Sequence, residues 1–548
     1  MSSDRQERHR SLLHTIWRWI AIAQLMLVTA LPSEGLNSTD TSTARQTNPG
    51  ASNYAALSRE ISNLLSSPQL RTTRLGLMVW SLDRDTMIFA RGGDERLTPA
   101  SLTKLYYTAA AFATMGPEYS IQTVVATNGT ITNGTVEGDL YVIGHGDCLL
   151  TLSELEALAD KLRTLGIRRI RGSIIADATY FDPIVDRQQY SGDDERMENL
   201  PPISALGIEG NRLTVVVTRG RGTSVRVRSL PSSDAIATTW TSLPVRTAPS
   251  EPRRRTRQLH RRQRYGDRLV IRHRTRRRTV GVSLQPVKIS SSLRSDGVQE
   301  IRVFGMPRPN SSVSFTVTML DPPLVVAGAF KQSLSATGIA VEGGIGKGAA
   351  PNTVRRLASW ERPLRDLVML CNKNSDNFIA EHVMKILGAY CSGNSQCNVN
   401  AYRSVVALLD SVGLDGHGGG VLLYDGSGLS RRNRATASSL VGLLRYCAHQ
   451  PWSESFFGTL AVAGEDGTLT RRMRRTPAEG NLRAKTGTHR NVSGLAGIVR
   501  ASNGERFVFA VIWNGNNVGL YKQLENQLGE ILASFGSNDV PSTEGSSH

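Results

Sequence analysis

The chain has 548 residues, of which 39% are hydrophobic and 20% are charged. This length is sufficient for two or three domains with buried cores, and the composition excludes a low-complexity or fibrous protein. The five cysteines contain no Cys-x-x-Cys pair, which argues against a zinc site, and the formal net charge of +18 is concentrated in one segment described below.

The first 35 residues have the pattern of an export signal. Arg5, Arg8 and Arg10 precede an apolar run from Ile20 to Leu31. This run is short for a helix that crosses a bilayer, so we expect residues 1–35 to be a signal peptide, with an uncleaved anchor or an ordinary buried helix as the alternatives. Residues 36–53 are rich in Ser, Thr and Asn and are expected to form a flexible leader.

Residues 54–121 are expected to begin a catalytic domain. Leu75–Leu82 and Met87–Arg91 are apolar runs separated by Asp83-Arg84-Asp85, which predicts a β-hairpin. Pro99–Phe112 follows with Leu105, Ala109 and Phe112 at helical spacing, so this segment is predicted to be a helix with one buried stripe.

Residues 122–345 differ in character and are expected to form inserted β-rich domains. Short β-rich runs alternate with turns such as Asn128-Gly129 and Asn133-Gly134, and Leu152–Leu165 is predicted to be an amphipathic helix. A segment at 246–278 contains fourteen arginines against Glu251 and Asp267, so most of the net positive charge lies there.

Residues 346–535 are expected to complete the catalytic domain. Helical segments come first, followed by three predicted strands and a closing amphipathic helix near Val518–Leu532. The two early strands and three late strands predict one antiparallel sheet flanked by helices, in an α+β fold. The tail at 536–548 is polar and is expected to be disordered.

Ser101 and Lys104 are the first candidate catalytic residues. Residues three apart on a helix lie on one face, which brings the Lys104 amine close to the Ser101 hydroxyl. A lysine whose charged form is disfavoured can take the proton of a serine, and the helix N-terminus favours a developing oxyanion. Taken alone, one Ser-x-x-Lys is expected by chance in a chain of this composition, and a capping serine beside a solvated lysine explains it equally well.

Two later stretches extend the pattern. Ser375-Asp376-Asn377 lies between helical segments, and Lys485-Thr486-Gly487-Thr488 ends a predicted strand. Gly487 permits close approach of a ligand to the backbone. Each stretch also has a structural explanation, as a helix cap or an ordinary strand end, but Ser-x-x-Lys, Ser-x-Asn and Lys-Thr-Gly in this order are the active-site set of penicillin-recognising serine enzymes.

With these motifs and the long gap between Ser101 and Ser375, the chain resembles the D-alanyl-D-alanine carboxypeptidases/endopeptidases of the penicillin-binding protein 4 type (peptidase family S13). The resemblance spans about Ala55 to Leu532 and includes Gly138–Val142, Ser204–Leu206 with Asn211, Asp425–Ser430 and Ala463–Leu469. It implies a penicillin-binding-protein/β-lactamase-like transpeptidase domain with large inserted domains. The family usually has proline where Cys148 stands, and the arginine-rich segment has no counterpart in the family pattern.

The resemblance also implies roles for individual residues. Ser101 attacks a terminal D-Ala-D-Ala bond, Lys104 acts as the general base, and Ser375 with Lys485 passes a proton to the leaving D-alanine. Asn377 holds the substrate amide, while Thr486, Gly487 and Thr488 bind the substrate, with the N–H groups of Ser101 and Thr488 as the oxyanion hole. Asp425 and Asp466 are expected to support loops. No metal or cofactor is implied.

The expected partners are peptidoglycan stem peptides, with β-lactams as covalent inhibitors, in the periplasm or cell envelope. A β-lactamase is the nearest alternative enzyme, but no glutamate follows around Ser411–Gly420 to speed deacylation, so slow release of β-lactams is expected. A non-catalytic protein that binds polyanions, or an anionic envelope surface, through the arginine-rich segment is the alternative from another class, and nucleic acid is not an expected partner of an exported protein. Cys391 and Cys397 could close a small disulfide loop in that compartment, against free thiols.

Overall fold

The computed structural model describes residues 49–193, 199–242, 287–414 and 420–537. The predicted signal peptide, most of the leader, the arginine-rich segment, a strand expected at Thr279–Gln285 and most of the tail lie outside these residues. The chain divides into residues 1–52 and 53–548, and the second unit is the subject below. In the described part of the chain, no helix is both long enough and apolar enough to cross a membrane.

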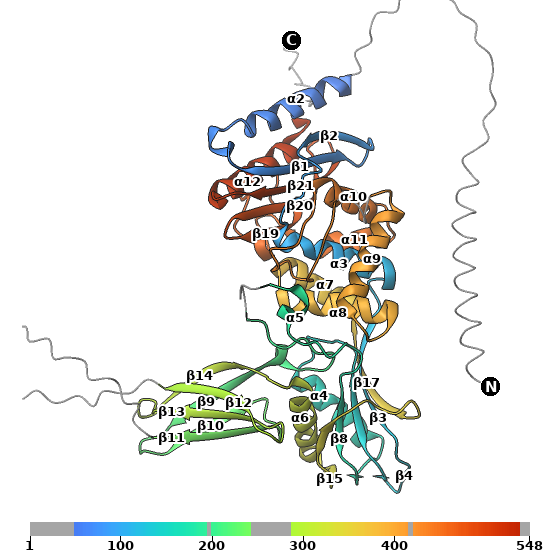
Figure 1. Ribbon diagram of the computed structural model, residues 1–548, viewed down its shortest axis with the longest axis vertical. Helices are drawn as coiled ribbons and strands as arrows, with labels where there is room; N and C mark the ends of the chain where they lie inside the picture. The colour runs from blue at the N-terminus through green and yellow to red at the C-terminus, as the bar shows by residue number, and fades with distance from the viewer. Residues whose placement is uncertain (1–48, 194–198, 243–286, 415–419, 538–548) are drawn as a thin grey trace, which may run out of the picture. The chain divides into compact units, whose positions relative to one another are not determined.

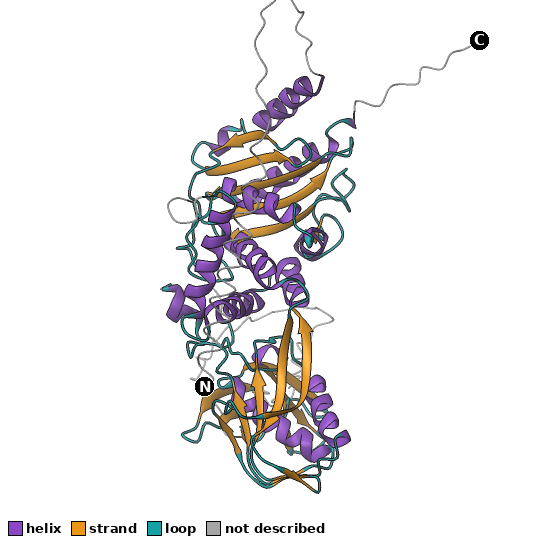
Figure 2. Cartoon of the chain, turned by 90° about the vertical axis from the view of Figure 1, so that its right-hand side faces the viewer, coloured by secondary structure: helices purple, strands orange, loops and turns teal. Residues whose placement is uncertain are grey.

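A six-stranded antiparallel sheet joins the two ends of this unit (Figures 1 and 2). Its order is β18-β19-β20-β21-β1-β2. The pairing of β21 with β1, from Arg74 opposite Asn514 to Ser81 opposite Phe507, confirms the predicted sheet. The strands are β1 (Arg74–Ser81), β2 (Thr86–Arg91), β18 (Ala461–Val462), β19 (Arg483–His489), β20 (Val492–Arg500) and β21 (Arg506–Asn514).

Helices cover both faces of this sheet (Figure 2). Apolar residues of β1, β20 and β21 alternate between two cores, because successive strand side chains point to opposite faces. On one face lie α2 (Pro49–Leu64) and α12 (Val518–Ser534), and on the other lie helices that include α3 (Thr103–Met115) and α10 (Ala437–Ala448). The remaining helices of this part are α7 (Leu364–Asn374), α8 (Asn377–Ser392), α9 (Cys397–Ser411) and α11 (Ser453–Gly458).

The helix that carries Lys104 corrects the sequence prediction in two respects. Ser101 lies in a short 3₁₀ turn, η2 (Ala100–Leu102), directly before α3. Every residue from Thr103 to Phe112 is buried, rather than one stripe. The small residues Ala109, Ala110 and Ala111 allow neighbouring elements to pack closely around α3, which is why a stripe read from the larger residues underestimates its burial.

The segment after α3 forms a second sheet of five strands in the order β16-β8-β6-β3-β17. It packs with two helices, α4 (Leu152–Thr164) and α6 (Pro322–Ala336), around a separate apolar core. A small four-stranded sheet adjoins them in the order β15-β7-β5-β4. The strands are β3 (Ser120–Thr127), β4 (Ile131–Thr132), β5 (Thr135–Val136), β6 (Leu140–Gly144), β7 (Arg169–Ile170), β8 (Ile174–Asp177), β15 (Ala340–Val341), β16 (Ile345–Lys347) and β17 (Arg355–Pro363).

Two three-stranded sheets, β10-β9-β14 and β11-β13-β12, complete the inserted part. Their strands alternate buried and exposed side chains, as expected for sheets with one face on a core. The strands are β9 (Arg212–Arg219), β10 (Val225–Leu230), β11 (Ile236–Thr241), β12 (Lys288–Leu293), β13 (Gln299–Phe304) and β14 (Ser311–Thr318).

The domain limits remain a proposal, which the strand pairing refines. β17 was expected in the catalytic domain, but it pairs along its length with β3 of the second sheet, from Arg355 opposite Thr127 to Pro363 opposite Ser120. We therefore propose that the inserted part ends near Pro363 rather than at 345. All five cysteines are free thiols, so the disulfide alternative for Cys391 and Cys397 is not adopted.

Candidate active site

Ser101 and Lys104 lie together where η2 passes into α3. The Lys104 Nζ donates a hydrogen bond to Ser101 Oγ over 3.0 Å. Lys104 is fully buried, whereas Ser101 is half-buried. The turn is tight, because Ala100 has a φ of +50°, in the left-handed region that L residues seldom adopt. A partly accessible hydroxyl with a buried amine beside it is the arrangement that the spacing predicted.

Lys104 has further acceptors from two other parts of the chain. Its Nζ donates to Asn377 Oδ1 over 2.7 Å and to the backbone carbonyl of Ser427. Burial lowers the pKa of Lys104, while nearby acidic groups, including Cys371 and Asp425, oppose this effect. The lowered pKa makes a neutral amine, which is the form that can accept a proton, more accessible than in an ordinary lysine.

Ser375 and Lys485 form a second pair. Ser375 lies between α7 and α8 in the left-handed conformation, with a φ of +59°, while Asp376 caps α8 by accepting from the Ile379 N–H over 2.9 Å. Lys485, on β19, donates to Ser375 Oγ over 2.8 Å. Burial holds the pKa of Lys485 well below its usual value, and the charge of Lys104 lowers it further.

The rest of the β19 stretch lies against η2. A side-chain carbon at Gly487 would come within 2.6 Å of the Pro99 carbonyl oxygen, so only glycine permits this packing. The group that approaches Gly487 is thus the chain's own backbone. Thr486 Oγ1 donates to Thr468 Oγ1 over 2.9 Å, and Thr488 is exposed. Thr468 lies in the quoted Ala463–Leu469 stretch but was not singled out from the sequence.

The turn from Asp425 to Ser430 holds the carbonyl that accepts from Lys104. The fully buried Asp425 accepts from the N–H groups of Gly428 (3.0 Å) and Ser430 (2.8 Å) and from Asn433 Nδ2 (2.7 Å). Gly428 has a φ of +82° and lies against the Ala100 carbonyl. Asp425 therefore supports the turn, in agreement with its expected role. Asp466 similarly pairs with Lys373.

Glu381 and Arg187 were missed by the sequence analysis. Glu381 is fully buried on α8 and accepts from the N–H groups of Gly426 (3.1 Å) and Ser427 (2.8 Å). It lies one helical turn after Asn377, so i, i+4 spacing could have pointed to it. Arg187 is in the inserted part and reaches Asp425 over 3.0 Å, a contact for which the sequence offers no local signal.

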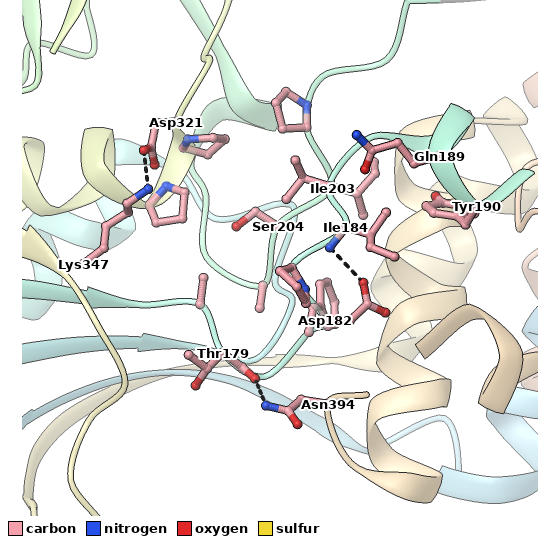
Figure 3. Close-up of a pocket in the computed structure, with 18 of the residues that line it drawn as sticks. Thr179, Asp182, Ile184, Gln189, Tyr190, Ile203, Ser204, Asp321, Lys347 and Asn394 are labelled. Carbon is pink, nitrogen blue, oxygen red and sulfur yellow. Dashed lines mark hydrogen bonds and ion pairs between the residues drawn. The ribbon is translucent and has the colours of Figure 1, made fainter. Parts of the chain in front are cut away.

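A cavity of about 1070 Å³ lies between the inserted part and the start of α9 (Figure 3). Its wall is mostly apolar, and Asp321 pairs with Lys347 on one side. None of the predicted site residues lines this cavity, so its size does not identify the reactive centre. Within the described ranges, no cluster of His, Cys, Asp and Glu could hold a metal ion.

This arrangement is suited to nucleophilic acyl transfer. It has an accessible hydroxyl, two buried amines with lowered pKa values and a carboxamide at their junction. The structure thus brings Ser101, Lys104 and Asn377 together, places Ser375 with Lys485, and lays the Gly487 backbone against η2.

Comparison with known proteins places this geometry in context. The D-alanyl-D-alanine carboxypeptidase of Actinomadura sp. (strain R39) is 28% identical over 502 residues, covering 88% of this chain and 86% of its own. The D-alanyl-D-alanine carboxypeptidase DacB of Haemophilus influenzae is 24% identical over 451 residues, covering 82% and 86%.

A solved structure shares the fold. The crystal structure of penicillin binding protein 4 (dacB) from Haemophilus influenzae superposes with a TM-score of 0.64 at 22% identity, covering 87% of this chain and 99% of that one. This likeness confirms the expected penicillin-binding-protein fold. The model of the D-Ala-D-Ala carboxypeptidase 3 (S13) family matches residues 57–272 and 271–535. The chain therefore belongs to the D-Ala-D-Ala carboxypeptidase 3 (S13) family and is a peptidase.

Proposed function

We propose that this protein is a serine-type D-Ala-D-Ala carboxypeptidase/endopeptidase that acts on peptidoglycan stem peptides through an acyl-enzyme on Ser101. The observation that carries the proposal is the 3.0 Å hydrogen bond from the buried Lys104 amine to the Ser101 hydroxyl. The names of the relatives support the substrate class. A β-lactam complex of the Haemophilus influenzae penicillin binding protein 4 supports inhibition by β-lactams.

The acylation step uses both buried lysines. Neutral Lys104 takes the proton of Ser101 as its Oγ attacks the carbonyl carbon of the terminal peptide bond. The N–H groups of Ser101 and Thr488 stabilise the oxyanion. The carbon–nitrogen bond then breaks, and the leaving D-alanine nitrogen receives a proton through Ser375 and Lys485, which are 2.8 Å apart.

The remaining site residues bind the substrate. Asn377 orients the substrate amide from its position at Lys104, and Thr486 and Thr488 hold the terminal carboxylate beside Lys485, with the Gly487 backbone between them. Closely spaced lysines attract an anionic peptide terminus and disfavour each other's charge. Water then hydrolyses the Ser101 ester, which releases the shortened peptide and regenerates the hydroxyl.

The site of action is proposed to be the cell envelope, in the periplasm where one exists. The basic head and apolar run of residues 1–35 support export. Peptidoglycan is assembled and trimmed outside the cytoplasm, so an exported enzyme meets the proposed substrate there.

The test is release of D-alanine from a pentapeptide ending in D-Ala-D-Ala, with the same peptide ending in L-Ala-L-Ala as the control. We expect release from the first peptide only, and its loss in Ser101→Ala. Release that persists in Ser101→Ala would reject Ser101 as the nucleophile. A cross-linked muropeptide assayed in parallel separates endopeptidase from carboxypeptidase action.

A further inference from the structure

We infer that Arg187, contributed by the inserted part, is a positioning residue that holds the Asp425–Ser430 turn and thereby sets the charge and position of Lys104. The inference deepens the proposed function and rests on the role given there to Lys104. It assigns the inserted part a direct influence on the proposed reactive centre.

Arg187 is an unusual side chain for the start of a short surface helix, because it is only 3% exposed. It opens α5 (Arg187–Ser191), and its Nη1 donates to Asp193 over 2.7 Å and to Asp425 over 3.0 Å. Asp193 also accepts from Ser430 Oγ over 2.7 Å. Buried charges are retained when they are paired, and here one guanidinium joins two carboxylates from segments far apart in sequence.

The contact with Asp425 reaches Lys104 through one turn of backbone. Asp425 accepts from the N–H groups of Gly428 and Ser430, so its carboxylate fixes the shape of the turn. Ser427, inside that turn, presents its carbonyl to Lys104 Nζ. A shift of Asp425 would therefore displace an acceptor of the proposed base.

The same short helix supports the turn a second time. Tyr190 donates to Glu381 Oε2 over 2.9 Å, and Glu381 accepts from the N–H groups of Gly426 and Ser427. Figure 3 shows Tyr190 at the wall of the cavity, beside Gln189 of the same helix. Two side chains of α5 thus reach the turn through two different carboxylates.

Charge gives this contact a measurable consequence. Asp425 and Glu381 are buried near Lys104, and both favour its protonated form, as do Asp376 and Cys371. Lys485 and His489 also lie within its electrostatic neighbourhood.

Arg187 offsets the two buried carboxylates. Without its charge the surroundings of Lys104 become more negative, the pKa of Lys104 rises, and less of the neutral base is present at a given pH.

The experiment measures the pH dependence of acylation by a fluorescent penicillin in wild type, Arg187→Met and Arg187→Lys. We expect Arg187→Met to move the midpoint of the acidic limb upward by about 0.5–1 pH unit, since removing a nearby charge shifts a pKa by this order. Arg187→Lys keeps the charge and should retain the wild-type midpoint. Arg187→Gln, which keeps donors without charge, is the second neutral variant in case Arg187→Met does not fold.

Arg362→Met is the matched control. Arg362 also joins two carboxylates, Asp147 at 2.8 Å and Glu154 at 2.7 Å, but none of them belongs to the proposed reactive centre. We expect its midpoint to equal that of wild type. An unchanged midpoint in folded neutral variants of Arg187, or an equal shift in Arg362→Met, would overturn the inference.

The titration of Lys104 itself separates this inference from the proposed function. In protein with ¹³C-labelled lysine, the Lys104 signal is assigned by its loss in Lys104→Met. A higher midpoint in Arg187→Met supports the inference even if β-lactams do not react, and an unchanged midpoint rejects it. Failure of the wild-type protein to be acylated would instead count against the proposed function.

Discussion

The catalytic and inserted parts both have apolar cores, yet they treat charge very differently. In the catalytic part, Lys104, Lys385 and Lys485 are fully buried. In the inserted part, pairs such as Arg169–Glu342 and Arg294–Asp296 lie at the surface, with each side chain about half exposed. Burying a charge is costly, so its retention marks a position where chemistry or assembly requires it.

Charge also joins the two parts. Lys385 of α8 pairs with Asp182 of the inserted part over 2.6 Å, and both side chains are almost fully buried. Arg187 and Asp425 make a second buried pair across the same boundary. The difference between the parts therefore teaches that buried ion pairs in this molecule occur at the proposed reactive centre and where the insert meets it.

The largest effect is expected from Lys104→Met. Loss of the proposed general base should lower the rate of acylation by about 10²–10⁴-fold. Since burial lowers the pKa of Lys104, the wild-type rate should rise with pH as the amine loses its proton and fall as the pH is lowered through that pKa. Stopped-flow labelling with a fluorescent penicillin measures both, with the half-exposed Lys347→Met as the control. A variant that keeps a tenth of the wild-type rate would contradict the assignment.

The buried pair between the two parts should be the next most sensitive. Asp182→Asn leaves Lys385 without its counter-charge, and breaking such a pair by removing one partner costs about 3–5 kcal/mol. Urea denaturation monitored by tryptophan fluorescence measures the free energy of unfolding. If the change is below 1 kcal/mol, the contrast drawn between buried and exposed pairs is wrong.

Gly428→Ala tests the turn that holds the Ser427 carbonyl. Its φ of +82° is strained for alanine, and the added carbon would lie 2.1 Å from the Ala100 carbonyl oxygen. Strain of this kind costs about 1–3 kcal/mol before the clash is counted. We expect lower stability together with slower acylation, because Ala100 precedes Ser101. The matched control is Gly504→Ala, which also has a positive φ but has open space around it; similar acylation rates in both variants would contradict the role of this contact.

The smallest effect is expected at the surface of the inserted part. Glu342→Gln removes the partner of Arg169 in a half-exposed pair, and such pairs contribute about 0–1 kcal/mol. The same urea titration provides the comparison with Asp182→Asn. A loss as large as that at Asp182 would show that exposure does not govern these pairs.

The sequence predicted those features that depend on local spacing. The Ser101–Lys104 contact follows from a three-residue separation at the start of a helix, and the five main strands of the sheet follow from their apolar runs. The parallel pairing of β11 with β13 was not foreseen, since strand partners are not encoded in a single run. The complete burial of α3 was also missed, because alanines carry little periodic signal.

Contacts between distant segments set the limit. Glu381 could have been found at one turn from Asn377, but Arg187 reaches Asp425 across 238 residues of sequence. No pattern around Arg187 distinguishes it from the many exposed arginines of the chain. Its importance becomes visible only when burial and partners are known.

The central claim is that Ser101 is the nucleophile activated by Lys104. Incubation with benzylpenicillin followed by proteolysis and mass spectrometry locates any covalent adduct directly. The account predicts a single penicilloyl adduct on the peptide that contains Ser101, strongly reduced in Lys104→Met and absent in Ser101→Ala. An adduct on another residue, or labelling that is unchanged in Ser101→Ala, would contradict it.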